Sequence, residues 1–219
     1  MKILSVETSG KTFSIALSEG KKTLASLYYN NGNMHSENLL SSIEKITSDA
    51  NTSLKDIDKF AVSTGPGSFT GIRIGMTVVK TLAQFLNKPV FAANTLEILE
   101  SSFVEISGVK IITAIDALRN EVYVKERKKV IIKNIHVFIE SLKKIKEQVM
   151  LIGNASAIYR EAVEKNLKGK VIFVSDFDNM PQAHKLAQLA YLSKKNYSYD
   201  QVEPLYIRKS WAEEKIASI

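Results

Sequence analysis

A pattern that restarts halfway along the chain constrains the fold more than any other feature of the sequence. The apolar segment "KILSVE" ends at Glu7, and a segment of alternating apolar residues begins six positions later at Phe13. The segment "KIITAID" ends at Asp116, and a second alternating segment begins six positions later at Val122. The order β-β-β-α-β-α of strands and helices is started twice, which predicts a mixed α/β protein of two related halves. The alternative is that any two β-hairpins of an α/β protein look alike, since the match is one of pattern more than of identity.

The boundary between the halves is expected near Ser107 and Gly108. This gives domains of residues 1–107 and 108–219, with the last segment returning to the first half. The first domain should begin with three tightly connected antiparallel strands. It should continue with helices over residues 36–48 and 70–86, and a third helix capped by Asn94 or Thr95. The second domain is expected to contain a helix over residues 137–148, a strand over residues 149–152, a helix from residue 156, a strand over residues 170–176 and a helix over residues 181–195.

Composition excludes several classes of protein. Cysteine is absent, so there is no disulfide framework, thiolate metal site or cysteine nucleophile. The first apolar run is broken by Glu7, which is not typical of a signal peptide, and no apolar run is long enough to span a membrane. We therefore expect a cytoplasmic protein without membrane contact.

The net charge of +7 is a weak indication of nucleic-acid binding. Twenty-five of the thirty basic residues are lysine, whereas base and phosphate recognition favours the planar fork of arginine. Specific reading of RNA by this chain is therefore disfavoured. A weak contribution to holding RNA stays open, because counterion release depends on charge alone.

Two acidic residues lie at the ends of strands, where α/β proteins commonly bind ligands. Glu7, with its neighbour Thr8, and Asp116 would hold Mg²⁺ and a triphosphate if the two halves brought them together. The simpler interpretation is that each acid ends a strand and begins a turn. It is favoured because neither acid is followed by the glycine that lets a phosphate approach the backbone. A metal site at His35 would need a second histidine one turn later, and that position is Leu39, so no metal site is expected.

The glycine-rich stretch "STGPGSFTGIRIGM" offers two interpretations. It lacks the Gly-Lys-Ser/Thr of a Walker loop, and Thr70 stands where the dinucleotide fingerprint needs its third glycine. A helix that follows a glycine loop still attracts anions, but without specificity. The helix from residue 70 is apolar around nearly its whole circumference, and Gly71 and Gly75 lie one turn apart, which allows another backbone to approach. Burial in the core of the chain and burial against another protein both fit this pattern.

Several motifs together resemble the TsaB family, also called YeaZ, over essentially the whole chain. They are "ILSVETS", "MHSENLL", "STGPGSFTGIRIGM", "IDALRNEVYV" and "EPLYIRKS". The resemblance implies the actin-like ATPase (ASKHA) fold, in which two RNase H-like halves contain mixed sheets flanked by helices. It also implies joint action with TsaD, which holds the catalytic metal and nucleotide, and with the ATPase TsaE. The reaction is transfer of threonylcarbamoyl from threonylcarbamoyl-AMP to N6 of adenosine 37 in tRNAs that read codons beginning with A.

The resemblance also implies roles for residues. The chain would be a non-catalytic subunit, a heterodimer with TsaD and a homodimer when alone, which reaches tRNA only through the complex. No metal or tightly bound cofactor is expected on this chain, although a Mg-nucleotide at the interface shared with TsaD would involve Glu7, Thr8 and Asp116. Family members usually have aspartate in place of Glu7 and glycine in place of Asn120, and asparagine tolerates a left-handed turn. The partner interface implied by the family comprises Leu39, Leu40, Ile43, Gly65, Pro66, Gly67, Ser68, Phe69, Thr70, Gly71, Arg73, Ile74 and Gly75.

A function of another class stays open beside this one. It is an independent kinase or hydrolase of the actin-like fold, which would use Glu7 and Asp116 with Mg²⁺ and ATP.

Overall fold

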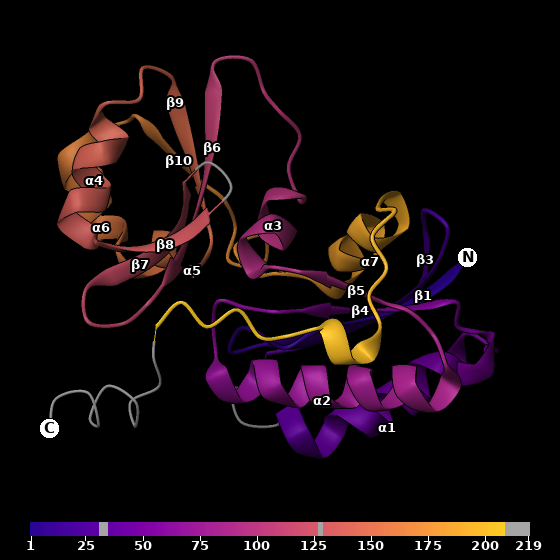
Figure 1. The fold of residues 1–219 in the computed structure, drawn as a ribbon. Helices are drawn as coiled ribbons and strands as arrows, with labels where there is room; N and C mark the ends of the chain where they lie inside the picture. Colours follow the sequence, from indigo (N-terminus) through magenta and orange to yellow (C-terminus); the bar gives the residue numbers. More distant parts are fainter. Residues whose placement is uncertain (31–34, 127–128, 209–219) are drawn as a thin grey trace, which may run out of the picture.

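Two five-stranded mixed sheets of the same topology form the protein (Figure 1). The computed structural model describes residues 1–30, 35–126 and 129–208, and only the backbone of residues 35–37. The first sheet has the order β3-β2-β1-β4-β5, and the second has the order β8-β7-β6-β9-β10. In each, the first strand of the half pairs antiparallel with the next strand and parallel with the fourth. The repeat expected from the sequence is therefore confirmed at the level of topology, and the chain has the actin-like fold.

The two halves contain the following elements. The first half has β1 (Lys2–Glu7), β2 (Phe13–Glu19), β3 (Lys22–Tyr29), α1 (His35–Asp49), η1 (Leu54–Asp56), β4 (Lys59–Ser63), α2 (Phe69–Leu86), β5 (Val90–Ala93) and α3 (Thr95–Glu100). The second half has β6 (Val109–Asp116), β7 (Glu121–Glu126), β8 (Lys129–Asn134), α4 (Ile135–Lys143), β9 (Gln148–Ile152), α5 (Asn154–Ile158), α6 (Arg160–Leu167), β10 (Val171–Phe173), α7 (Ala183–Leu192) and η2 (Tyr199–Gln201).

Helix boundaries differ from those expected where a capping residue or a break was overlooked. α3 begins as expected, because the Asn94 side chain accepts from the Glu97 amide in a capping box. α4 begins earlier than predicted, because the side chain of Asn134 accepts from the His136 amide at 3.0 Å. The helix expected from residue 156 is two short helices, α5 and α6, which meet at Tyr159.

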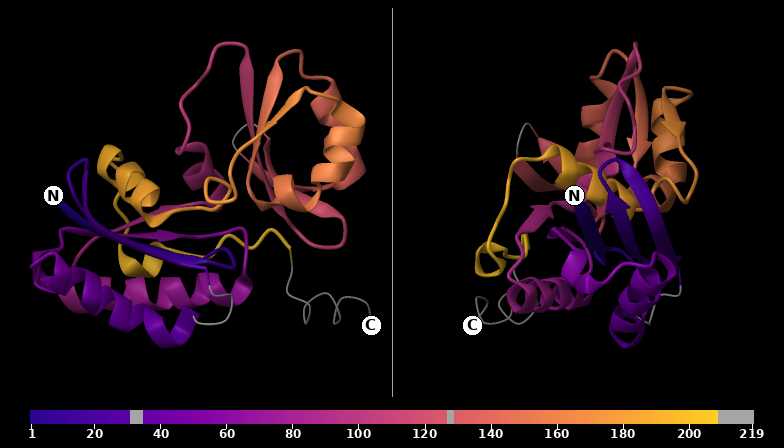
Figure 2. Two further views of the ribbon diagram at one scale, coloured as in Figure 1. Left: turned by 180° about the vertical axis from the view of Figure 1, so that it is seen from behind. Right: turned by 90° about the vertical axis from the view of Figure 1, so that its right-hand side faces the viewer.

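Helices cover the first sheet on both faces. α1 and α2 pack on one face around Leu39, Ile43 and Met76, and α7 packs on the other around Leu186 (Figure 2). α7 is fixed to the sheet at its start, where the Ser5 hydroxyl donates to the carbonyl of Ala183 at 2.7 Å. A helix late in the chain thus completes the core of the first half.

Helix α3 lies between the two sheets (Figure 1). Its Ile98 belongs to the apolar cluster of the first sheet and α7, whereas Leu96 and Leu99 pack with Ile115 and Met150 of the second sheet. α3 comes from the first half of the sequence and α7 from the second, so each half contributes a helix to the packing of the other. The division at residues 107 and 108 stays a prediction about folding units. No helix in the described part of the chain is both long and apolar enough to cross a membrane.

Candidate functional site

The glycine-rich stretch connects β4 to α2 at the centre of the first half. The Ser68 side chain caps α2 by accepting from the Gly71 amide at 3.2 Å. Gly65 has φ 93° and is buried, and its carbonyl accepts from the Thr95 amide at 2.8 Å. The loop therefore needs glycine for its own backbone path and is tied to the start of α3.

Three glycines of this stretch face the turn that follows β1. A Cβ added at Gly67 would lie 2.0 Å from the carbonyl oxygen of Ser9, and one at Gly71 would lie 2.1 Å from that of Thr8. A Cβ at Gly75 would lie 2.2 Å from Thr8 Oγ1. Two hydrogen bonds hold the glycine-rich stretch to this turn. The Ser68 amide donates to the carbonyl of Ser9 at 2.7 Å, and the Thr8 hydroxyl donates to the carbonyl of Gly71 at 2.7 Å. The space beside Gly71 and Gly75 is thus filled by the chain itself, by the Thr8 carbonyl at Gly71 and by the Thr8 side chain at Gly75, which corrects the interpretation that they admit a partner's backbone.

This contact also decides against a phosphate cradle at the loop. The space above Gly67 and Gly71 is occupied by the carbonyls of Thr8 and Ser9, which are hydrogen-bond acceptors and repel anions. The Ser68 and Gly71 amides are already bonded, to Ser9 O and to Ser68 Oγ.

Glu7 lies inside this contact. Its side chain is buried, and its Oε1 accepts from both the amide and the hydroxyl of Ser9 at 2.6 Å. Its Oε2 is buried without a hydrogen-bond partner. Burial raises the pKa of Glu7, and the hydrogen bonds from the Ser9 hydroxyl and amide offset part of that rise.

These residues do not fit a bound Mg²⁺. The ion takes several oxygen ligands and keeps some of its waters, whereas Glu7 offers one enclosed oxygen in an environment that favours the protonated acid. In residues 1–30, 35–126 and 129–208, no group of three or more His, Cys, Asp or Glu side chains is placed to hold a metal ion. The side chain of His35 lies outside the described ones, so the prediction for it stays untested.

Asp116 has a different environment. Its Oδ1 accepts from the Leu118 amide at 3.2 Å and from the Tyr159 hydroxyl at 2.9 Å. Desolvation and this carboxylate together raise the pKa of Tyr159 to about 12. Asp116 lines the cleft between the halves, but Glu7 and Thr8 do not, so the three residues predicted to bind nucleotide are not brought together around one space.

The cleft has a volume of about 410 Å³ and is lined by both halves of the molecule. The first half contributes the start of α2, the second half contributes the β6–β7 hairpin, and the C-terminal segment closes one side. The lining residues are Pro66, Gly67, Phe69, Ile72, Asp116, Ala117, Leu118, Arg119, Tyr123, Leu205, Tyr206, Ile207 and Arg208.

The tip of the β6–β7 hairpin has a strained backbone. Leu118, Arg119 and Asn120 have φ values of 60°, 55° and 57°, a left-handed conformation that non-glycine residues rarely adopt in sequence. Asn120 adopts the left-handed conformation that asparagine tolerates, and the hairpin is present. Leu118 is 69% exposed, so the strain does not serve to bury its side chain in the core.

A stack of three side chains stands at the mouth of the cleft. The rings of Phe69 and Tyr206 are stacked with centroids 4.5 Å apart, and the Arg73 guanidinium lies 4.0 Å from the Phe69 ring. Arg73 Nε also donates to the Tyr206 hydroxyl at 2.9 Å. Tyr206 and Arg208 both lie in the motif "EPLYIRKS", and nothing in their sequence context indicates these contacts.

The residues predicted to form a partner interface divide into two groups. The buried group comprises Leu39, Ile43, Gly65, Pro66, Gly71 and Gly75. The exposed or half-exposed group comprises Leu40, Gly67, Ser68, Phe69, Thr70, Arg73 and Ile74. Only the second group is accessible to another protein in this conformation.

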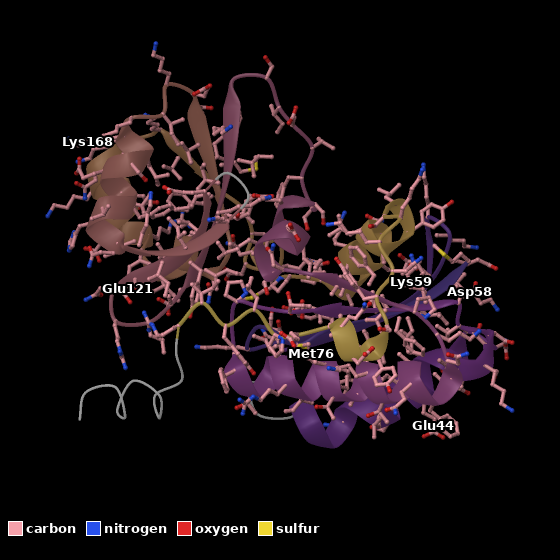
Figure 3. The ribbon with its side chains drawn as sticks, viewed as in Figure 1. Glu44, Asp58, Lys59, Met76, Glu121 and Lys168 are labelled. Atoms are coloured by element: carbon pink, nitrogen blue, oxygen red, sulfur yellow. The ribbon has the colours of Figure 1, made fainter. Side chains whose placement is uncertain are left out.

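Packing within the chain accounts for most of the apolar circumference of α2. The helix contacts the first sheet, α1 and η2, and Met76 faces the core in the view of Figure 3. The outermost positions are mostly polar, namely Thr70, Arg73, Thr77, Thr81 and Gln84, and they are joined by Phe85, which is 85% exposed. Core burial therefore explains the pattern that the sequence left open between core and partner.

A family model and several known proteins of one tRNA modification pathway match nearly the whole chain. The family model described as "TsaD: tRNA N6-adenosine threonylcarbamoyltransferase" matches residues 30–216. The tRNA threonylcarbamoyladenosine biosynthesis protein TsaB of Haemophilus influenzae is 30% identical, over 94% of this chain and 93% of its own length. The protein of the same name from Bacillus subtilis is 28% identical, over 98% and 97%. A tRNA N6-adenosine threonylcarbamoyltransferase of Brachyspira hyodysenteriae is 37% identical, but over only 42% of this chain and 32% of its own length.

Solved structures support the fold. The structure described as YeaZ from Pseudomonas aeruginosa has a TM-score of 0.72 at 24% identity, and covers 94% of this chain and 99% of its own. The ethanolamine utilization protein EutJ from Carboxydothermus hydrogenoformans has a TM-score of 0.52 at 7% identity. By its full-length similarity and the matching family model, the chain belongs to the TsaB (YeaZ) proteins of tRNA threonylcarbamoyladenosine biosynthesis, within the broad TsaD family.

Proposed function

We propose that this chain is a non-catalytic subunit that docks on a TsaD-type partner. With that partner and the ATPase TsaE, it serves the transfer of threonylcarbamoyl from threonylcarbamoyl-AMP to N6 of adenosine 37 in tRNAs that read codons beginning with A. The names of the full-length relatives and the matching family model support the pathway. The proposal that the chain is non-catalytic is based on the geometry around Glu7 and the glycine-rich loop.

The packing of the glycine-rich loop on residues 8 and 9 is the observation that carries this proposal. A catalytic subunit of the fold would need room at this loop for phosphate and an ionised acid for a metal ion. Here the Thr8 and Ser9 carbonyls fill that room, and Glu7 is enclosed with a raised pKa. The chain keeps the fold, but the loop leaves no room for a phosphate, and burial disfavours the ionised form of Glu7.

The docking face that we assign comprises accessible residues of α1 and α2, namely Leu40, Thr70, Arg73, Ile74 and Thr77. Leu40 is 60% exposed on α1, where an isolated chain gains nothing from an apolar side chain. A carboxylate placed in an interface without a partner is desolvated at a large cost. Leu40→Glu and Thr77→Glu are therefore expected to weaken binding to the TsaD-type protein of the same cell by about tenfold or more.

The measurement is affinity by calorimetry, supported by copurification of the coexpressed chains. Leu192→Glu is the matched control, because Leu192 is a 70% exposed leucine on α7, away from the docking face. Each variant must unfold at the temperature of the parent. Parental affinity in both docking-face variants, or an equal loss in the control, would contradict the assignment.

The alternative of an independent kinase or hydrolase is not favoured, because Glu7 does not line the cleft that contains Asp116. Calorimetry of the isolated chain with Mg²⁺ and ATP separates the two functions. We expect no binding tighter than about millimolar. Micromolar binding that Asp116→Asn abolishes would restore the alternative.

A further inference from the structure

The last four residues that the structure describes, residues 205–208, run from the first half to the second (Figure 1), and all four line the cleft. We call this segment the clasp. Its first anchor lies on the first half, where the Leu205 amide donates to the carbonyl of Thr64 at 2.8 Å. The Tyr206 ring stacks on Phe69 of α2, and its hydroxyl accepts from Arg73. The clasp is thus attached to the start of α2 by a hydrogen-bonded backbone and an aromatic contact.

The second anchor of the clasp lies on the second half. Arg208 Nη1 donates to the carbonyl of Ala117 at 2.7 Å, and Nη2 forms an ion pair with Glu121. The Arg208 and Glu121 side chains are only 20% and 34% exposed, so solvent screens the pair less than it screens a surface pair. One planar guanidinium holds both ends of the β6–β7 hairpin tip, a geometry that lysine does not reproduce. Figure 3 places Glu121 at the start of β7.

A second contact between the two halves is through α3. Leu96 and Leu99 pack on the second sheet, and Glu100 forms an ion pair with Lys125 of β7 at 2.6 Å. α3 precedes the second half in the chain and the clasp follows it. The second sheet is therefore attached to the first half through α3 and through the clasp. The segment between β10 and α7 adds a further connection, since Asn179 accepts from the Gly153 amide of the second half and α7 packs on the first sheet.

We propose that the clasp locks the two halves into one rigid body and keeps the cleft closed without a ligand. In two-domain proteins that close on a ligand, the ligand supplies the contacts that hold the domains together. In this chain Tyr206 and Arg208 supply such contacts from within, through α2 on one side and the hairpin tip on the other. Release of Arg208 leaves α3 and the segment that leads to α7 as the remaining connections between the two sheets.

The hairpin tip is the place where release of the clasp should be detected first. Residues 118–120 have left-handed backbones, which cost free energy unless surrounding contacts maintain them. The contacts that maintain this turn include hydrogen bonds from the Ala117 amide to Glu121 O, from the Glu121 amide to Leu118 O and from the Leu118 amide to Asp116 Oδ1, and Arg208 binds at both ends. Loss of the last contact should make the turn open more often.

The absence of cysteine allows a direct test on the isolated chain. Thr81→Cys on α2 and Glu161→Cys on α6 introduce two exposed thiols, one on each half, for spin labels. Labelled protein is diluted with unlabelled protein, so that the pulsed-resonance distance distribution reports only pairs within one molecule. We expect a single narrow distribution for the parent and a broader one that extends to longer distances for Arg208→Ala. Hydrogen exchange at the amides of residues 117–121 should become about tenfold faster, since one charge-assisted contact is lost.

Arg160→Ala is the matched control. Arg160 also forms an ion pair, with Glu164, and lies over an aromatic ring, that of Phe173, but all three residues belong to the second half. The amide hydrogens of β1 and β4 must continue to exchange slowly in every variant, because slow exchange there shows that the core of the first half is still folded. If Arg208→Ala does not fold, Arg208→Lys tests the same geometry, because it keeps the charge and loses the fork. Parental distance width and parental exchange in the folded Arg208 variant, or equal broadening in the Arg160 control, would overturn the proposal.

Discussion

Replacement of Gly71 by alanine tests whether the glycines of α2 serve the chain or a partner. In a helix interior without close neighbours, alanine is more stable than glycine by about 1 kcal/mol. If Gly71 were reserved for a partner's backbone, the isolated variant would therefore gain stability. The structure predicts the opposite sign, because the new Cβ would lie 2.1 Å from the carbonyl oxygen of Thr8.

The magnitude follows from three contributions. Forced overpacking of a tight interior costs about 1–3 kcal/mol. Displacement of Thr8 weakens its 2.7 Å hydrogen bond to Gly71 O, which contributes about 0.5–1.5 kcal/mol. After the helix-propensity gain of about 1 kcal/mol is subtracted, Gly71→Ala should lose about 0.5–3.5 kcal/mol and melt roughly 5 °C lower.

Gly75 provides a second test that can be rescued. A Cβ at Gly75 meets Thr8 Oγ1 at 2.2 Å, which is a side-chain atom, whereas a Cβ at Gly71 meets backbone. Thr8→Ala removes Oγ1, so it should restore much of the stability lost in Gly75→Ala and little of that lost in Gly71→Ala.

Urea denaturation of the isolated chain, followed by circular dichroism, measures both effects. The coupling between residues 8 and 75 comes from the double-mutant cycle. A rise in stability for Gly71→Ala, or zero coupling between Gly75→Ala and Thr8→Ala, would refute the reasoning.

Three further predictions concern the buried acid, the hairpin tip and the cleft. The folded pKa of Glu7 is raised, so its stabilising contribution is complete below its ordinary value of 4.5 and is lost as pH rises through the folded pKa. Glu7→Gln should remove this fall from the pH profile of the unfolding free energy, and parallel profiles would contradict it. Leu118→Gly and Asn120→Gly should each stabilise the isolated chain by roughly 1 kcal/mol by relieving a left-handed backbone, as denaturation would measure, and a loss in both would show that the tip is not strained. Asp116→Asn should lower the pKa of Tyr159 from about 12, as the carbon NMR shift of its phenol would show, and an unchanged value would assign the shift to burial alone.

Much of the fold could be predicted because its signals are local. The alternation after Phe13 and after Val122, and the capping residue Asn94, each act within a few positions of the chain. The α4 boundary was missed where another local signal, the cap at Asn134, was overlooked. The split between α5 and α6 at Tyr159 was also missed.

The candidate site was predicted less well, because its contacts join distant parts of the chain. Its position at the end of a strand makes Glu7 a candidate metal ligand. Only the tertiary structure shows that its side chain is buried and bonded to Ser9. Tyr206 and Arg208 were recognised as part of a motif but received no role, since their partners Arg73 and Ala117 lie about a hundred residues away.

The sequence by itself determined the succession of most strands and helices along the chain, the turn at Gly65 and Gly67, and the family. Turn chemistry and hydrophobic period could be recognised because they depend on neighbouring residues. Tertiary structure alone decided what the glycines face. A missing side chain permits close approach, but it does not specify whether a phosphate, a partner or the chain itself approaches. The Thr8 and Ser9 carbonyls occupy that space, which makes the glycine-rich stretch a packing contact within the first half.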